Sequence, residues 1–324
     1  MNRRFGILVG VIVAVIAIWA GVWLWAAGVA ASAVKTLETA DGITTPRVTC
    51  GSFSITGFPF GFDATCSDAT IVQADTTATV HGLKASVLVY NPFHVLAFAQ
   101  SPVTIDNALT GSRSRLDFAD AEASARLTGW RIGRVSLVVN APVWNDTILE
   151  DRLKAKASKV EFHLVDDPQK YDAQKGIAAL EEYVLVDGLT APLQDIANGH
   201  LTFEGEINGL PDDVRTYGDA DVLRRWQANG GAFRIVSLQG EDGDNRIASD
   251  GTLSLDASGR VQGQMKLISK GMVERFGAAI PDNFKGLVLG AQADDGSYSQ
   301  TINIVGGGIF AGLIPTGQTI PPLW

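Results

Sequence analysis

The longest apolar stretch of the chain lies near its N-terminus. No charged residue occurs between Phe5 and Val34, and the densest apolar part is Ile7–Trp25. A bilayer core is about 30 Å thick and needs roughly 20 apolar helical residues to cross it. The pattern therefore predicts an N-terminal transmembrane anchor in residues 1–28, which contacts the membrane through residues 7–28.

The residues that flank this span give it a direction. Arg3 and Arg4 precede it, and because cytoplasmic flanks are rich in such residues, the N-terminus is expected inside and the rest of the chain outside. The alternative is a cleaved signal peptide with Ala31-Ser32-Ala33 as its processing site, although signal peptides have shorter apolar regions of roughly 7–15 residues. Either way the remainder is exported. We expect a single-pass protein of a bacterial inner membrane, with its bulk in the periplasm.

Short segments of alternating apolar and polar residues follow the span. The clearest is His200–Ile207, in which Leu201, Phe203 and Ile207 share one face, as in a sheet with one buried and one solvated side. The residues Asn91-Pro92-Phe93 predict a break between strands, because proline lacks a donor for the ladder. The other predicted strands are Ser52–Ile55, Phe62–Ile71, Thr77–Val89, Val103–Leu109, Arg115–Leu127, Trp130–Asn140, Ala232–Leu238, Arg246–Leu255, Arg260–Ile268 and Tyr298–Val305.

Few segments favour a helix. Those with helical composition are Tyr171–Tyr183, Asp219–Ala228 and Lys270–Ala279. Strands that follow strands, with occasional helices, predict an α+β fold that is mainly antiparallel β, groove-like or sandwich-like. The expected organisation is a stalk at 29–46 and a periplasmic β-rich domain at 47–324, which divides into halves near 47–165 and 183–324.

The two cysteines of the chain, Cys50 and Cys66, both follow the span. A single pair in an oxidising compartment predicts a structural disulfide, here between the strands of a hairpin. Closing a loop of this size contributes about 3 kcal/mol in the chain-entropy model. No histidine lies between the two cysteines and no C-x-x-C motif occurs, which disfavours a metal or redox role.

Charge and motifs restrict the function further. The net charge is −9, and every charged residue except Arg3 and Arg4 follows the span, so the exported part is acidic. This disfavours nucleic acid as a partner and a broad electrostatic contact with anionic lipid headgroups. The four histidines are dispersed, and none of the common hydrolase or metal-site motifs occurs. The sequence therefore predicts no catalytic site, no metal and no cofactor.

The hairpin at 245–270 has a wide apolar face of small and medium residues. In the expected register this face carries Leu253, Leu255, Val261, Met265 and Leu267. Such a face fills an ordinary sandwich core, or it lines a groove that holds a lipid or another hydrophobic ligand.

Several segments resemble a bacterial family catalogued as domain of unknown function 2125. They are the turn "ITGFPFGFDATC", the segment "VLVYNPFHVLAFAQSP", the hairpin "DGTLSLDASGRVQGQMKLISKG" and the glycine-rich run that ends in "PPLW". The resemblance covers nearly all of the exported part and implies no functional residue. In architecture the pattern is also distantly similar to AsmA-like envelope proteins, whose β-grooves are associated with lipid, and this similarity concerns architecture alone.

Together these observations predict a non-enzymatic envelope protein that binds a lipid or another hydrophobic ligand, in envelope maintenance or transport. The alternative is a structural or adaptor protein that scaffolds periplasmic partners and has no ligand cavity. A continuous apolar lumen would favour the first function, whereas a packed interior with an exposed apolar patch would favour the second.

Overall fold

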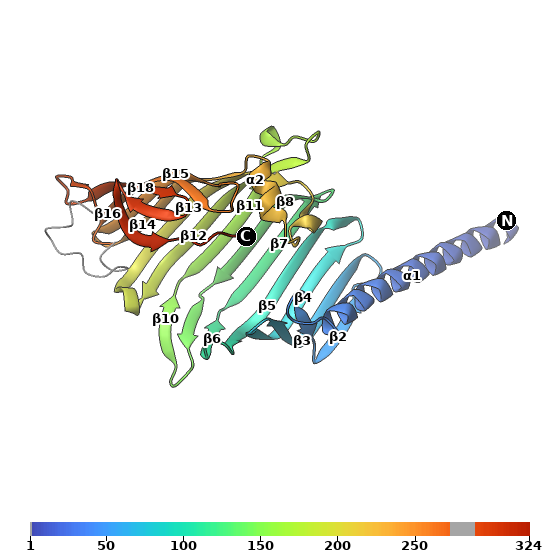
Figure 1. The fold of residues 1–324 in the computed structure, drawn as a ribbon. Coiled ribbons are helices and arrows are strands. Elements are labelled where there is room, and N and C mark those ends of the chain that lie inside the picture. Colours follow the sequence, from blue (N-terminus) through green and yellow to red (C-terminus); the bar gives the residue numbers. More distant parts are fainter. Residues whose placement is uncertain (1, 273–288) are drawn as a thin grey trace. The chain divides into compact units, whose positions relative to one another are not determined.

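The computed structural model of the protein describes residues 2–272 and 289–324 (Figure 1). It is mainly antiparallel β with two α-helices in this part of the chain, which confirms the predicted fold class. The chain divides into two compact units. Unit 1 contains Met1–Ser124 and Asn145–Arg152, and unit 2 contains Ala125–Trp144 and Leu153–Trp324.

Helix α1 (Asn2–Glu38) contains the predicted span and continues beyond it. Among the described residues it is the one helix long and apolar enough to cross a membrane, over Phe5–Glu38. Its side chains are exposed from Phe5 to Trp19. Further along, one side of the helix is buried or partly buried, at Ala20, Trp23, Ala27, Ala31 and Val34. The predicted stalk is thus helical as far as Glu38, and the helix contacts the first strand of the same unit, Arg47–Thr49.

Unit 1 is an antiparallel sheet of consecutive hairpins. Strands β1 and β2 both pair with β3, and β3 to β6 pair in chain order. A cluster of buried residues on one face, Cys66, Ala69 and Val80, forms its core. The strands are β1 (Arg47–Thr49), β2 (Ser52–Thr56), β3 (Gly61–Gln73), β4 (Thr76–Leu88), β5 (Asn91–Asn107) and β6 (Ser112–Asp117).

The predicted break at Asn91-Pro92-Phe93 is wrong by two residues. The chain turns at Val89 and Tyr90, and β5 already begins at Asn91. Pro92 is tolerated inside β5 because the ladder is irregular there, with a register shift between the pairs Val87↔Val95 and Leu88↔Asn91. A proline that lacks an N–H costs little where no ladder bond is required.

Unit 2 continues the antiparallel pattern. Strand β8 pairs with β11, each strand from β11 to β16 pairs with the next, and β18, β19 and β20 follow β16. Helix α2 (Val222–Ala228) lies beside β13, and short 3-10 turns occur at Pro168–Lys170, Pro192–Gln194 and Val214–Thr216. Strands β7 (Asp120–Thr128), β9 (Val143–Asp146) and β10 (Arg152–Lys156) run from one unit into the other along the chain. The others are β8 (Arg131–Asn140), β11 (Lys159–Asp166), β12 (Ile177–Ala191), β13 (Ile196–Pro211), β14 (Ala232–Asp242), β15 (Asn245–Leu255), β16 (Val261–Lys270), β17 (Ala291–Gln292), β18 (Tyr298–Val305), β19 (Gly308–Ala311) and β20 (Ile314–Thr319).

The predicted helix at Tyr171–Tyr183 is wrong. From Ile177 onward these residues belong to β12, which pairs with β11 on one side and with β13 on the other. Pairing along both edges of a strand outweighs a weak helical composition. The predicted helix at Asp219–Ala228 is present in a shorter form as α2. The one expected at Lys270–Ala279 lies outside the described residues apart from its first positions, and Lys270 ends β16.

The two units do not coincide with the halves expected at 47–165 and 183–324. That division would separate β11 from β12, yet these strands pair from Lys159↔Asp187 to Asp166↔Leu180. Both strands therefore belong to unit 2.

Candidate functional site

One side of unit 2 is apolar along its consecutive strands, and we call it the apolar face. Side chains alternate along each strand and paired residues point the same way, so the register identifies the members of a face. Representative members, one for each strand from β8 and β11 to β16 and β18, are Leu137, Phe162, Val184, Phe203, Phe233, Leu253, Met265 and Ile302. The intervening residues of these strands form the opposite side, which we call the polar face.

All five residues predicted to line a ligand surface lie on the apolar face: Leu253, Leu255, Val261, Met265 and Leu267. Leu255 pairs with Val261, and Met265 lies opposite Gly251. A Cβ atom at Gly251 would approach the Cγ of Met265 to 2.9 Å, so glycine leaves room for the methionine. Leu255 is buried and the other four are partly buried. That they contact a ligand stays a prediction.

The apolar face is incompletely covered. Leu180, Leu255 and Ile304 are buried, but Phe203 and Phe233 remain partly exposed and Leu137 is 39% exposed. In a closed sandwich the inward side chains of both sheets interdigitate at interior packing density. A partly accessible apolar face can instead contact an apolar ligand.

One carboxylate, Glu182 of β12, lies on this face. It pairs with Leu164 of β11 and Gly205 of β13, and its nearest neighbours on the same side of its own strand are Leu180 and Val184. In the described part of the chain no cationic group reaches salt-bridge distance of it, and burial raises the pKa of Glu182 above its ordinary value. A carboxyl group in such surroundings favours a hydrogen-bond donor or a cation as a partner.

An aromatic pair lies next to Glu182. The rings of Phe203 and Phe233 are stacked with centroids 6.0 Å apart and planes inclined by 26°. A Cβ atom at Gly205 would lie 2.8 Å from Cε1 of Phe203 and 3.3 Å from Cε2 of Phe233, so the rings occupy the space over this glycine. Glu182 and the two rings together place one polar group beside a broad apolar surface.

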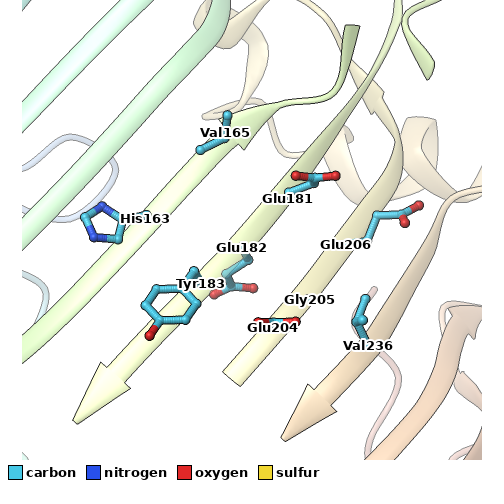
Figure 2. A pocket seen from close by; sticks show the side chains of 9 residues that line it. All are labelled: His163, Val165, Glu181, Glu182, Tyr183, Glu204, Gly205, Glu206 and Val236. Atoms are coloured by element: carbon cyan, nitrogen blue, oxygen red, sulfur yellow. The ribbon is translucent and has the colours of Figure 1, made fainter. Parts of the chain in front are cut away.

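The polar face holds a shallow depression of about 370 Å³ (Figure 2). Two of the charged groups around it, Glu206 and His163, have local partners, and Glu182 is also among the lining residues. The buried carboxylate of Glu206 accepts a hydrogen bond from Nζ of Lys170 at 2.8 Å, and this bond lowers the pKa of Glu206. His163, also at the depression, contacts Glu161 at 3.3 Å. These contacts are those of structural ion pairs, and in the described residues no three His, Cys, Asp or Glu side chains are placed to hold a metal ion.

Three of the four histidines have different local partners. Nε2 of His94 lies 2.9 Å from Oγ of Ser124, His163 contacts Glu161, and Nδ1 of His200 lies 3.1 Å from Asp187. The His94–Ser124 contact supplies two members of a hydrolase triad, but nucleophilic catalysis also needs an oriented third group and an oxyanion site. That the protein is not an enzyme stays a prediction from the sequence.

The structure contains the predicted disulfide between Cys50 and Cys66, with Cα atoms 5.4 Å apart. Cys66 belongs to the buried core of unit 1, and Cys50 packs against that core. The bond therefore ties the short connection between β1 and β2 to the middle of β3, as expected for a structural crosslink.

Sequence analysis did not identify Glu182, because the residue fell inside the segment predicted as a helix. No curated protein and no solved structure matches the chain. A family model described as an uncharacterized protein conserved in bacteria (DUF2125) matches residues 23–319. The match includes both units and begins inside α1. The chain therefore belongs to the DUF2125 family.

Proposed function

We propose that the protein is a non-enzymatic, membrane-anchored protein of the bacterial envelope that binds a lipid or another hydrophobic ligand on the apolar face of unit 2. The observation that carries the proposal is the incomplete cover of that face across its consecutive strands. Contiguous apolar surface that remains accessible in a folded protein marks a site of interaction.

Two further observations support this assignment. Helix α1 has the length and composition of a membrane anchor, which would place the rest of the chain next to lipid. The disulfide Cys50–Cys66 fits an oxidising compartment such as the periplasm. With α1 anchored in the inner membrane, unit 2 would then act on the periplasmic side.

The apolar face suits an amphipathic molecule better than a purely apolar one. Acyl chains would contact the leucine, valine and phenylalanine side chains, whereas Glu182 would accept a hydrogen bond from the polar end. Pairing would stabilise the ionised carboxylate, whose cross-strand partners are Leu164 and Gly205. This chemistry favours a ligand with an ammonium, amide or hydroxyl group next to its acyl chains.

The experiment compares two matched substitutions in the full-length protein. Leu137→Glu places a charge on the apolar face, and Val165→Glu places one on the polar face of the adjacent strand. The two side chains are similarly exposed, at 39% and 37%, so both variants should fold and show the same thermal unfolding midpoint. The measurement is photo-crosslinking to a diazirine-labelled phospholipid in detergent micelles, with mass spectrometry of co-purified lipids.

We expect Leu137→Glu to lower crosslinking at least fivefold and Val165→Glu to leave it unchanged. Equal crosslinking in both variants and in the unmodified chain would overturn lipid binding on this face. A purified protein that carries no lipid, but retains specific periplasmic protein partners that Leu137→Glu removes, would favour the scaffolding alternative.

A further inference from the structure

Helix α1 is tied to the sheet of unit 1 at the level of two tryptophans. Nε1 of Trp19 donates a hydrogen bond to the carbonyl oxygen of Pro59 (3.1 Å), and Nε1 of Trp23 donates one to that of Gly61 (2.9 Å). Both acceptors belong to the turn Gly57–Gly61, which joins β2 to β3. These two bonds fix the position of the turn along the axis of the helix.

That position coincides with the point at which a span would end. The residues from Asn2 to Trp23 rise about 32 Å at about 1.5 Å per residue, and a bilayer core is about 30 Å thick. The side chains from Phe5 to Trp19 are exposed, and Figure 1 shows this part of α1 extending beyond the strands of unit 1. If α1 crosses the membrane, the turn therefore lies where the helix leaves the hydrocarbon core.

A second hairpin tip, Leu88–Phe93 between β4 and β5, lies beside the first. Gly61 pairs with Leu88, and the N–H of Val89 donates a hydrogen bond to the carbonyl oxygen of Phe60 at 3.0 Å. The two tips therefore reach the same level at one end of the sheet of unit 1.

Both tips expose large apolar side chains. They are Phe58 (50% exposed), Phe60 (68%), Leu88 (45%), Tyr90 (76%) and Phe93 (45%). No Asp, Glu, Lys or Arg occurs in 56–62 or in 87–98. An uncharged cluster rich in phenylalanine and tyrosine is costly in water and well suited to the boundary between hydrocarbon and headgroups.

The opposite end of the same sheet has a different character. There the turn after β5 lies next to a depression lined by Asp75, Asp106 and Arg113. The aromatic cluster is thus confined to the end of unit 1 that accompanies the free part of α1. Apolar side chains are exposed at the opposite end as well, at Leu109 (79%) and Ile148 (50%), so the difference between the two ends lies in charge and in aromatic side chains.

We propose that the two hairpin tips, Gly57–Gly61 and Leu88–Phe93, insert into the headgroup layer of the membrane that α1 crosses, with Phe58, Phe60, Tyr90 and Phe93 as the contact residues. The inference rests on the membrane anchorage proposed above and is independent of a ligand on unit 2. It implies that unit 1 is seated on the bilayer surface rather than held away from it by a stalk.

The test uses the full-length protein in vesicles of phosphatidylethanolamine and phosphatidylglycerol. A single fluorescent non-natural amino acid replaces Phe60 or Tyr90, which leaves the disulfide intact, and quenching by lipids spin-labelled at the headgroup reports contact with that layer. The control position is Leu109, which is 79% exposed at the far end of β5. A probe at Val11, with lipids spin-labelled in the middle of the acyl chain, reports the span itself.

We expect at least fivefold stronger headgroup quenching at positions 60 and 90 than at position 109. Quenching at 60 and 90 no greater than at 109, with strong acyl-chain quenching at 11, would overturn the insertion of the tips and leave the anchor in place. Absence of quenching at 11 would overturn the span, and with it this inference.

Discussion

Replacing Trp23 with alanine is expected to release helix α1 from the turn Gly57–Gly61. Trp23 is 8% exposed, whereas the side chains of Val22 and Leu24 on either side of it in the helix are exposed. Its ring stacks on Phe62 with centroids 5.3 Å apart and planes inclined by 7°, and it contacts Phe58 edge to face at 5.7 Å. Its indole N–H bonds the carbonyl oxygen of Gly61. The substitution removes all three contacts together.

The size of the effect follows from those contacts. A favourable aromatic pair contributes about 0.5–1.5 kcal/mol beyond its buried area, and a neutral hydrogen bond contributes about 1 kcal/mol. Truncating a buried tryptophan to alanine typically costs 3–5 kcal/mol. We take about 3 kcal/mol, because Trp23 lies at the edge of unit 1. Since about 1.4 kcal/mol corresponds to a factor of ten, local opening of the turn should become roughly a hundredfold more frequent.

Hydrogen exchange followed by mass spectrometry measures this opening directly. The reporters are the amides of Phe60 and Gly61, which donate hydrogen bonds to the carbonyl oxygen of Gly57 at 3.2 and 2.9 Å. Where exchange reports the opening equilibrium, their rates should rise roughly a hundredfold in Trp23→Ala, and about fivefold in Trp23→Phe, which loses the hydrogen bond but keeps an aromatic ring.

Trp25→Ala is the matched control, because Trp25 is two residues away in the same helix and is 71% exposed. Its exchange should equal that of the unmodified protein. Equal protection of the turn in the Trp23 and Trp25 variants would refute the assignment of Trp23 as the residue that holds α1 on the sheet of unit 1.

Three further predictions concern the disulfide, the apolar face and the C-terminus. Replacing both Cys50 and Cys66 with serine should lower the free energy of unfolding by about 3 kcal/mol in urea titrations followed by circular dichroism, and an unchanged midpoint would contradict a structural role for the bond. Burial raises the pKa of Glu182 in the folded state above its ordinary value of 4.5, so its ionisation destabilises the fold as the pH rises from 4.5 through the raised pKa. In Glu182→Gln this loss of stability should be absent, and the thermal midpoint should fall less with rising pH than in the unmodified protein. Parallel pH profiles of the two proteins would exclude the effect. The ring of Trp324 lies over Gly259 and within 5.8 Å of the guanidinium of Arg224, so Trp324→Ala should make the tail susceptible to carboxypeptidase, and an unchanged digestion rate would show that the ring does not hold it.

Local alternation was sufficient to predict much of the β structure. The hairpin Arg246–Ile268 appears as β15 and β16, and its five apolar residues share a face because a period of two fixes sidedness inside a hairpin. Tyr298–Val305 was predicted with its observed ends. In both cases the alternation of apolar and polar residues within each strand is strong enough to predict the strand without knowledge of the strands that pair with it.

The errors arose in segments whose secondary structure is determined by pairing with other strands. Strand β11 was not predicted, and β12 was assigned to a helix in part, because Ile177, Leu180 and Tyr183 recur at a spacing close to one helical turn. In the sheet, Leu180 lies on the apolar face and Tyr183 on the polar face. Only the pairing with β11 and β13 distinguishes the two structures, and those contacts join residues that are distant in the sequence.

The same limit explains why the carboxylate of the apolar face could not be predicted. As part of a helix, Glu181 and Glu182 would be two equivalent surface residues, but in β12 they point to opposite faces, and only Glu182 lies between Leu164 and Gly205. In the sequence, Gly205 is a residue type that destabilises a strand. In the sheet, the absence of a side chain at Gly205 leaves the space that the rings of Phe203 and Phe233 occupy. Partial burial of Glu182 raises the pKa of its carboxyl group and disfavours the ionised form, a cost that a leucine at position 182 would not have. Under the proposed function a ligand would supply a partner for this carboxylate, so the position of Glu182, more than the extent of the apolar face, is the reason to propose an amphipathic ligand.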